Sequence, residues 1–259
     1  RLKNKIMDRL VYTALGAISN ADFLRVQQAN DMANVATVGY KRSASNSPVA
    51  IDLNGSGFNV RAQAVVPSMI DEVNLTPGAA ISTGNPLDIF MENSTVMGVQ
   101  AADGSLAFTR RGDLHINATG VLETGSGDIV MSDGGPITIP TGTIISISRD
   151  GTIFALDPQA GNAEQQPVGE LMLRDASGTR LLKREDGLYT PKEPADGGDF
   201  TSGNVPVSVI PEMLEGSNVN PIEVMVSILD MQRSFETQMK IIKNTEEMDR
   251  DGANLMRLS

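Results

Sequence analysis

Residues that could carry out chemistry are few in this chain, and they are scattered. His115 is the only histidine, and it lies in Asp113-Leu-His-Ile-Asn117, an alternation that is typical of a strand. The imidazole could act as a lone general base, but an exposed or hydrogen-bonded strand residue explains it with fewer assumptions. No second histidine and no cysteine is present to complete a metal site. We therefore expect no metal ion and no cofactor.

Two further patterns have equally simple explanations. Glu246, Glu247 and Asp249 could form a carboxylate site, but they fall in a predicted helix, where a solvated acidic face is expected. Arg111-Gly112-Asp113 matches a cell-adhesion tripeptide, and a hairpin turn would explain the same residues. The chain has no Gly-x-Ser-x-Gly, phosphate-binding loop or dinucleotide fingerprint. The sequence predicts that the protein is not an enzyme.

The composition also limits the partners. With 259 residues the chain can bury a core, and its net charge of −11 disfavours binding to nucleic acid or to an anionic membrane. No run approaches the roughly 20 apolar residues of a membrane span, so we expect no direct membrane insertion. No convincing cleaved signal peptide opens the sequence. The absence of cysteine fits a cytosolic protein or one that crosses a membrane unfolded.

The N-terminal part is expected to form a helix from about residue 8 to about residue 36. Its apolar residues recur at spacings of four and three, which is the pattern of a heptad stripe. Gly39 is expected to stop the helix. The members of the stripe are Leu10, Ala14, Ala17, Ala21 and Leu24.

A second helix is expected from Pro221 to about Met256. Asn220 can cap it, Pro221 suits the first helical position, and Glu223 follows the cap by three residues. Isolated helices are marginal in water, so we expect both ends of the chain to become ordered only beside neighbouring copies. The apolar stripe of this helix is formed by Val224, Ile228, Met231, Phe235, Met239 and Ile242.

The middle of the chain indicates an antiparallel β domain. Ile144–Ile147, Thr152–Leu156 and residues 170–174 are β-prone runs, and Asp-Gly turns at Gly104, Gly151 and Gly187 separate such runs. We therefore predict an α+β fold in which the two helices form a coiled-coil-like inner layer. The predicted parts are an N-terminal helix in 1–39, a linker or extended segment in 40–70, the β domain in 71–209, a connection in 210–220 and the C-terminal helix in 221–259.

Asn30 and Asn34 lie four residues apart in the first predicted helix. Residues at this spacing share one helix face. Their side chains could face solvent, or their amides could form hydrogen bonds across a helix–helix contact and set its register.

Residues 27–42 resemble the N-terminal signature of the bacterial flagellar rod and hook protein family, Ala-Asn-x-x-Thr-x-Gly followed by Tyr or Phe and Lys. The C-terminal signature is similar to residues 214–223, which include Asn218, and to residues 232–236. Residues 82–88, 103–110 and 134–140 resemble landmarks of the family's β domain. The residues that match the N-terminal signature are Ala33, Asn34, Thr37, Gly39, Tyr40 and Lys41.

Within that family the likeness is greatest to proteins of the proximal rod. One departure is that residues 92–98 read Glu-Asn-Ser-Thr-Val-Met-Gly, where distal-rod relatives often carry Gly-x-Gly-Phe-Phe. The resemblance implies export in an unfolded state through the flagellar type III apparatus, without a cleaved signal. It also implies an inner tube of terminal helices, in contact with copies of the chain and with other rod proteins, across the periplasm. The motif residues Asn30, Asn34, Thr37, Gly39, Tyr40 and Asn218 are then expected at the assembly interface, together with both apolar stripes.

Two alternatives stay open. A distal rod or hook subunit would differ in position and copy number but not in chemistry. A binding or adhesion module built on the β domain is the more distant alternative, and it would need a secretion signal.

Overall fold

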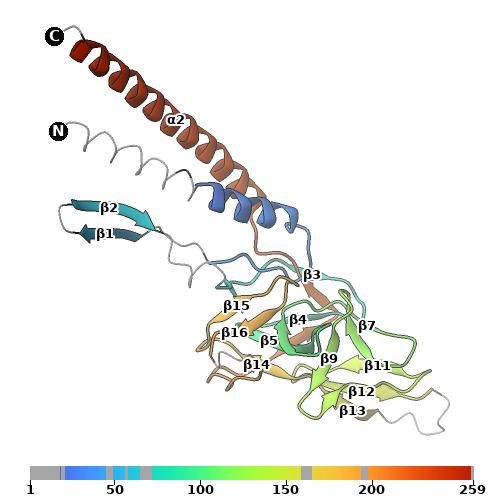
Figure 1. Cartoon of the computed structure of the whole chain (residues 1–259). Helices are drawn as coiled ribbons and strands as arrows, with labels where there is room; N and C mark the ends of the chain where they lie inside the picture. Colours follow the sequence, from blue (N-terminus) through green and yellow to red (C-terminus); the bar gives the residue numbers. More distant parts are fainter. Residues whose placement is uncertain are drawn as a thin grey trace. The chain divides into compact units, whose positions relative to one another are not determined.

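The computed structural model describes residues 18, 21–44, 49–55, 58–64, 72–158, 165–193 and 198–257 (Figure 1). The chain divides into two compact units. The parts of unit 1 are Arg1–Ala33, Ser45–Ile70 and Asn220–Ser259, and those of unit 2 are Asn34–Ala44 and Asp71–Val219. The mixture of helices and antiparallel strands confirms the α+β class.

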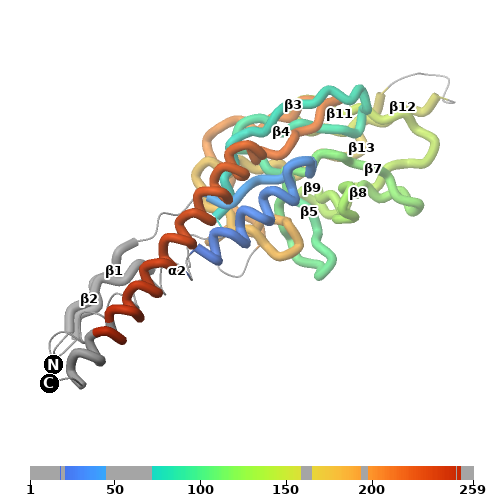
Figure 2. The backbone as a smooth tube through the Cα atoms, turned by 90° about the horizontal axis from the view of Figure 1, so that it is seen from above, coloured from blue at the N-terminus to red at the C-terminus, as the bar shows by residue number. Residues whose placement is uncertain are grey.

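Unit 1 contains two helices that lie side by side. One covers residues 21–33, and the other is α2, Pro221–Arg257. Figures 1 and 2 both show residues 21–33 along the first turns of α2. The Nε2 of Gln28 donates a hydrogen bond to the Oγ of Ser227, which joins the two helices through side chains.

The start of α2 agrees with its prediction. The Oδ1 of Asn220 accepts hydrogen bonds from the N–H of Ile222 over 3.0 Å and from that of Glu223 over 3.4 Å. These bonds satisfy two of the four N–H groups that a helix start leaves without a helical partner. The helix then continues through Gly252 to Arg257 because no proline interrupts it.

Asn220→Ala is expected to destabilise the first turn of α2 by about 1 kcal/mol, because two amides lose their acceptor. Hydrogen exchange of the Ile222 and Glu223 amides in the full chain would measure the loss as faster exchange. Asn220→Asp keeps an acceptor at the same position and should leave exchange nearly unchanged. Equal exchange rates in the alanine variant and the native chain would contradict the capping role.

The N-terminal helix ends earlier than predicted. Its last residue is 33, and residues 34–36 form a turn. The Oγ1 of Thr37 donates to the Oδ1 of Asn34 over 3.1 Å, and the Thr37 N–H donates to the Asn34 carbonyl oxygen over 3.1 Å. Such local bonds from asparagine and threonine compete with helical bonds, which explains why the helix stops here. Asn30 and Asn34 therefore do not share a face of one continuous helix.

The segment expected to be a linker contains a hairpin. β1, Val49–Gly55, pairs antiparallel with β2, Phe58–Ala64, from Val49 opposite Ala64 to Gly55 opposite Phe58. A hairpin was not predicted within the linker or extended segment 40–70. The signal that was missed is the alternation of apolar and polar residues in the sequence of both strands, which has the period of a strand.

Unit 2 is built from antiparallel pairs of short strands. Its largest sheet has nine strands in the order β15-β16-β6-β5-β9-β8-β7, with β10 paired to β9 and β14 to β5. A three-stranded sheet has the order β11-β12-β13, and two strand pairs, β17 with β4 and β18 with β3, complete the unit. The strands are β3 Ala80–Ser82, β4 Ile89–Met91, β5 Thr95–Gln100, β6 Leu106–Thr109, β7 Leu114–Ile116, β8 Leu122–Thr124, β9 Ile129–Ser132, β10 Gly135–Pro136, β11 Ile144–Ile147, β12 Thr152–Leu156, β13 Gln166–Glu170, β14 Leu173–Asp175, β15 Leu181–Lys183, β16 Tyr189–Pro191, β17 Val209–Pro211 and β18 Met213–Glu215.

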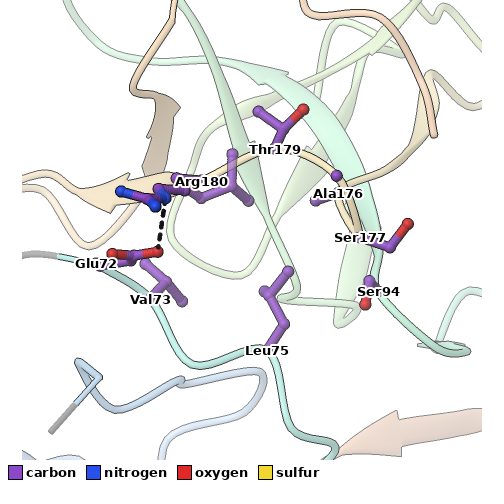
Figure 3. Close-up of a pocket in the computed structure, with 10 residues that line it drawn as sticks. Glu72, Val73, Leu75, Ser94, Ala176, Ser177, Thr179 and Arg180 are labelled. Atoms are coloured by element: carbon purple, nitrogen blue, oxygen red, sulfur yellow. Dashed lines mark ion pairs between the residues drawn. The ribbon is translucent and has the colours of Figure 1, made fainter.

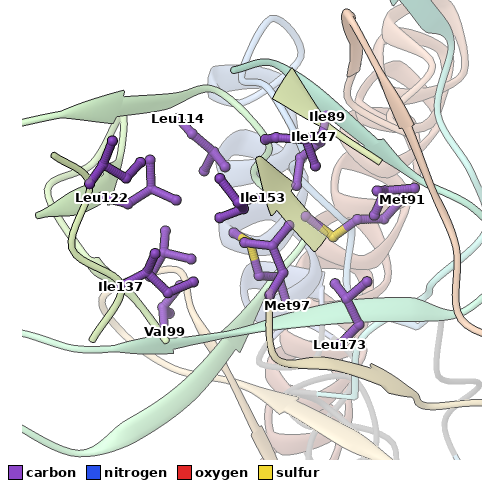
Figure 4. Close-up of a cluster of buried hydrophobic side chains, with 14 of the residues drawn as sticks. Ile89, Met91, Met97, Val99, Leu114, Leu122, Ile137, Ile147, Ile153 and Leu173 are labelled. Carbon is purple, nitrogen blue, oxygen red and sulfur yellow. The ribbon is translucent and has the colours of Figure 1, made fainter. Parts of the chain in front are cut away.

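The main core of unit 2 lies between the two larger sheets (Figure 4). Met97 and Val99 of β5 contribute to it from the nine-stranded sheet, and Ile147 of β11 and Ile153 of β12 contribute from the three-stranded sheet. Val209 of β17 is fully buried in the same cluster. β17 therefore contributes to the core of unit 2.

Several predicted details of the β domain hold and two do not. Ile144–Ile147 and Thr152–Leu156 are strands with the predicted bounds. Gly104, Gly151 and Gly187 occupy hairpin turns at φ between 81° and 89°, where glycine is favoured. The run 170–174 is divided between two strands, β13 and β14. Arg111-Gly112-Asp113 is not a hairpin turn, because the Gly112 carbonyl oxygen accepts from the N–H of Ile89 in a neighbouring strand.

Candidate functional site

Stretches of unit 2 that are far apart in the sequence meet at one place, which we call the junction. The N–H of Gly39 donates to the carbonyl oxygen of Glu215 over 2.7 Å. The N–H of Asn218 donates to the carbonyl oxygen of Tyr40 over 3.2 Å. The segment that follows the N-terminal helix is thus hydrogen-bonded to the segment that precedes α2. The junction consists of residues 39–42, 74–79 and 215–218 and the side chain of Arg110.

Gly39 is needed for a close approach within the junction. A Cβ atom at this position would lie 2.4 Å from the carbonyl oxygen of Arg110, and the residue has a φ of 67°. Both observations favour glycine. Gly39 lies several residues beyond the helix end, so its role is not the helix stop that the sequence predicted.

Three fully buried charged side chains form the centre of the junction, and we call them the ion cluster: Lys41, Arg110 and Glu215. The Nζ of Lys41 donates to the Oε1 of Glu215 over 2.7 Å, and the Nε of Arg110 donates to the Oε2 over 2.7 Å. All three side chains have no exposed surface. Buried charges are tolerated when they are paired and hydrogen-bonded. One carboxylate here neutralises two cations only in part.

The remaining donors of the cluster bind backbone carbonyl groups. Arg110 Nη1 donates to the carbonyl oxygens of Asn93 over 2.7 Å and Thr95 over 2.9 Å, and Lys41 Nζ donates to that of Thr76 over 2.9 Å. Arg110 thereby connects the junction to the start of β5. A guanidinium group suits this task because its donors point in fixed directions.

Burial and charge shift two acid–base equilibria in the junction. Burial is the main cause that lowers the pKa of Lys41 to about 8, and the neighbouring Arg110 acts in the same direction, while Glu215 opposes both. Burial also raises the pKa of the Tyr189 hydroxyl. Tyr189 reaches the junction through its hydroxyl, which donates to the carbonyl oxygen of Gly39 over 3.4 Å.

The lowered pKa of Lys41 predicts that unit 2 gains stability from this residue as the pH rises above 8. The unfolded chain keeps an ordinary lysine pKa near 10.4 and so binds more protons than the folded chain between these values. The free energy of unfolding then increases with pH by at most about 1.4 kcal/mol per pH unit. Urea unfolding of the native chain and of Lys41→Met, from about pH 7.5 to about pH 9.5, would show a difference that grows with pH. A difference that stays constant would contradict the shift.

Asn218 and Tyr40 complete the junction. The Oδ1 of Asn218 accepts from the N–H of Arg42 over 2.8 Å, and its Nδ2 donates to the carbonyl oxygen of Asn74 over 2.9 Å. The Nζ of Lys183 lies 3.7 Å from the ring centre of Tyr40, a cation–π contact. Both predicted residues thus have a role inside unit 2, and their assignment to an interface between subunits stays a prediction.

The apolar stripes of unit 1 are buried to different degrees. Val224 is buried, whereas Phe235 and Met239 expose 39% and 47% of their surface. Asn30 is exposed. Leu10, Ala14 and Ala17 lie outside the described residues. The half-buried members of the two apolar stripes are Ala21, Leu24, Ile228, Met231 and Ile242.

The start of α2 has a second apolar face. Ile222, Met225, Val226 and Leu229 follow one another at the spacing of one helix face, and their exposed fractions are 72%, 57%, 52% and 53%. An apolar row of this kind on an amphipathic helix normally lies against another element.

The described residues contain little that could perform catalysis. The Nε2 of His115 lies 3.7 Å from the Oε2 of Glu123 in an exposed strand pair, and no group of three or more potential metal ligands occurs in the described ranges. A cavity of about 360 Å³ lies beside β15 (Figure 3), and its Glu72 and Arg180 form an ion pair of 3.7 Å with each other. A search of the described helices found none long and apolar enough to cross a bilayer.

The ion cluster was not predicted from the sequence. Lys41 was singled out as part of a motif, but its bonds to Glu215 and the role of Arg110 were not predicted. A signal was present, since each residue belongs to a different motif: 27–42 contains Lys41, 103–110 ends at Arg110, and 214–223 contains Glu215. Three separate motifs thus meet in one buried contact.

Comparison with known proteins gives matches along the whole chain. Residues 95–155 match the D1 domain of flagellar hook proteins FlgE, FlgF and FlgG, and residues 210–255 match the C-terminal region of flagellar basal body rod proteins FlgE, FlgF and FlgG. The chain is 34% identical to the flagellar basal-body rod protein FlgF of Salmonella typhimurium, over 98% of this chain and 100% of the relative.

Two more relatives extend the comparison. The FlgF protein of Escherichia coli is 34% identical over 93% of this chain and 95% of its own length. The rod protein FlgG of Bacillus subtilis is 27% identical over 97% of this chain and 100% of its own length. With two relatives at 34% identity that match nearly its full length, this chain belongs to the flagellar basal-body rod protein family.

Proposed function

We propose that this protein is a structural subunit of the proximal part of the flagellar rod. It assembles with copies of itself and with other rod proteins into a helical tube that transmits torque from the motor to the hook. Membership of the rod family supports the structural role and the location in the basal body. Two FlgF relatives at 34% identity support the proximal part of the rod.

The observation that carries this proposal is the apolar surface that α2 leaves exposed. Ile222 and Leu229 on one face, and Phe235 and Met239 on the other, are more exposed than apolar residues of a helix stripe usually are. Neighbouring subunits would cover both faces at once, because two different faces of one helix suit head-to-tail contacts better than a closed dimer. In this proposal both terminal helices form the inner layer of the tube as a coiled coil.

The same proposal includes the route to the rod. The chain is exported unfolded by the flagellar type III apparatus, and it works in the periplasm as a mechanical part and not as an enzyme. A composition with no cysteine supports transit in an unfolded state, because no disulfide has to be reduced first.

A distal rod subunit is the second candidate function. The match to FlgG of Bacillus subtilis along nearly the whole of both chains favours it. The sequence of residues 92–98, which lacks the aromatic pair that distal-rod relatives often carry, speaks against it.

Electron microscopy of purified basal bodies tests the proposal directly. Unit 2 has its own fold and can be located in density or with an antibody against it. We expect the chain in the part of the rod nearest to the motor. Its location in the distal rod would support the second candidate, and its absence from the rod would refute both.

A further inference from the structure

The two backbone segments of the junction run in the same direction. Gly39 is bonded to Glu215, and Tyr40, the next residue, is bonded to Asn218. The N–H of Arg42 is then bonded to the side chain of Asn218. Because the partners advance together along both segments, residues 39–42 and 215–218 lie parallel and not antiparallel.

This direction decides how the junction responds to tension. The N-terminal part of the chain enters at Gly39, and the C-terminal part leaves after Asn218. In a parallel pair, these two points lie at opposite ends of the paired stretch. Tension between the termini therefore acts along the stretch and strains all of its bonds at the same time. In an antiparallel pair the same tension would open the bonds one after another.

From this geometry we infer that the junction is a mechanical clamp, which holds unit 2 closed when the two ends of the chain are pulled apart. The clamp combines the backbone bonds of residues 39–42 and 215–218 with the ion cluster and the side chain of Asn218.

Two features make this clamp strong. The ion cluster is fully buried, so no water molecule can form a substitute hydrogen bond when one of its bonds is strained. Hydrogen bonds are also stronger in a buried environment than in water. Glu215 is also held by Arg110, whose Nη2 donates to the carbonyl oxygen of Met91 over 2.5 Å and connects the clamp to β4. Force that enters at Gly39 passes directly to Asn218, and the strands between them carry little of it until the clamp breaks.

The inference goes beyond the proposed function, because it concerns the response of this fold to tension in any setting. Its use in a rod would rest on the proposed function. The two can fail separately: electron microscopy tests the location of the chain, whereas the clamp is tested on the isolated protein.

Single-molecule force spectroscopy of the full chain, held at its two ends, tests the clamp. The terminal helices should extend first at low force. The stretch that the clamp closes, which comprises most of unit 2 and also residues 45–70 of unit 1, should then be released in one step. The gain in length should be about 570–630 Å, because Lys41 and Glu215 are 174 residues apart. Opening of the native unit 2 in several short steps at low force would overturn the inference, and this readout needs no variant.

A matched pair of variants separates mechanical strength from ordinary stability. Asn218→Ala removes side-chain bonds to Arg42 and Asn74 inside the clamp. Asn117→Ala removes side-chain bonds to Thr119 and Val121 in the turn between β7 and β8. At constant force we expect Asn218→Ala to break about tenfold faster than the native chain, and Asn117→Ala to stay within about twofold. An equal or larger effect of Asn117→Ala would overturn the inference.

Discussion

Glu215→Gln is expected to lower the free energy of unfolding of unit 2 by about 3–5 kcal/mol. The change keeps the size of the side chain but removes the negative charge that faces Lys41 and Arg110, and all three side chains are fully buried. Arg110 would then keep its charge in the interior of the protein without a counter-charge, and Lys41 would lose the carboxylate that favours its charged form. Urea unfolding of the full chain, followed by circular dichroism in the strand region, would measure the loss.

Glu170→Gln is the matched control, because Glu170 is exposed at the end of β13 and the chemical change is the same. Its free energy of unfolding should stay within about 0.5 kcal/mol of the native value. Limited proteolysis gives a second readout if the Glu215→Gln chain is too unstable for a full titration: unit 2 should be cleaved rapidly. A variant as resistant as the native chain would show that the cluster adds no stability.

Phe235→Ala is expected to abolish swimming in a bacterium in which it replaces the native chain. The ring is 39% exposed in the single chain, so part of it is available to a neighbouring subunit. Truncation of a phenylalanine that is buried in a contact costs about 3–5 kcal/mol, and the cost recurs in every subunit of a helical assembly. Swimming assays would measure the defect, and immunoblots of the exported fraction should show that the variant still leaves the cytoplasm.

Arg233→Ala on the same helix is the comparison. The Arg233 side chain is 79% exposed and forms a surface ion pair of 3.4 Å with Asp230, a kind of contact that contributes at most about 1 kcal/mol. We expect these cells to swim. Normal swimming of the Phe235→Ala cells would contradict the proposed tube of terminal helices.

Features set by neighbouring residues could be predicted from the sequence. The start of α2 at Pro221 follows from Asn220, whose side chain makes the expected capping bonds. The three β-branched isoleucines of Ile144–Ile147 predict a strand, and β11 has these bounds. The end of the N-terminal helix was missed because the apolar stripe, whose last member is Leu24, does not mark where the helix stops, and the bonds between Thr37 and Asn34 were not foreseen.

The ion cluster could not be predicted in the same way. Lys41 and Glu215 are 174 residues apart, and Arg110 and Glu215 are 105 residues apart. Local periodicity carries no information on contacts over such distances, and a buried lysine or glutamate is unusual enough that composition argues against it. The predicted interface residues of the two helices stay a prediction, because they concern contacts between chains.

The position of Glu215 in the last strand of unit 2 also orders the folding of the chain in time. Hairpins such as that of β11 and β12 close over a few residues and can form early. The two buried cations, in contrast, have to wait for an acid that comes more than 100 residues after Arg110. If a chain of this kind emerged from a narrow channel with its N-terminus first, its hairpins would thus be formed while unit 2 as a whole was still incomplete. Unit 2 is complete only when β18 is in place, so its folding ends with the burial of Glu215.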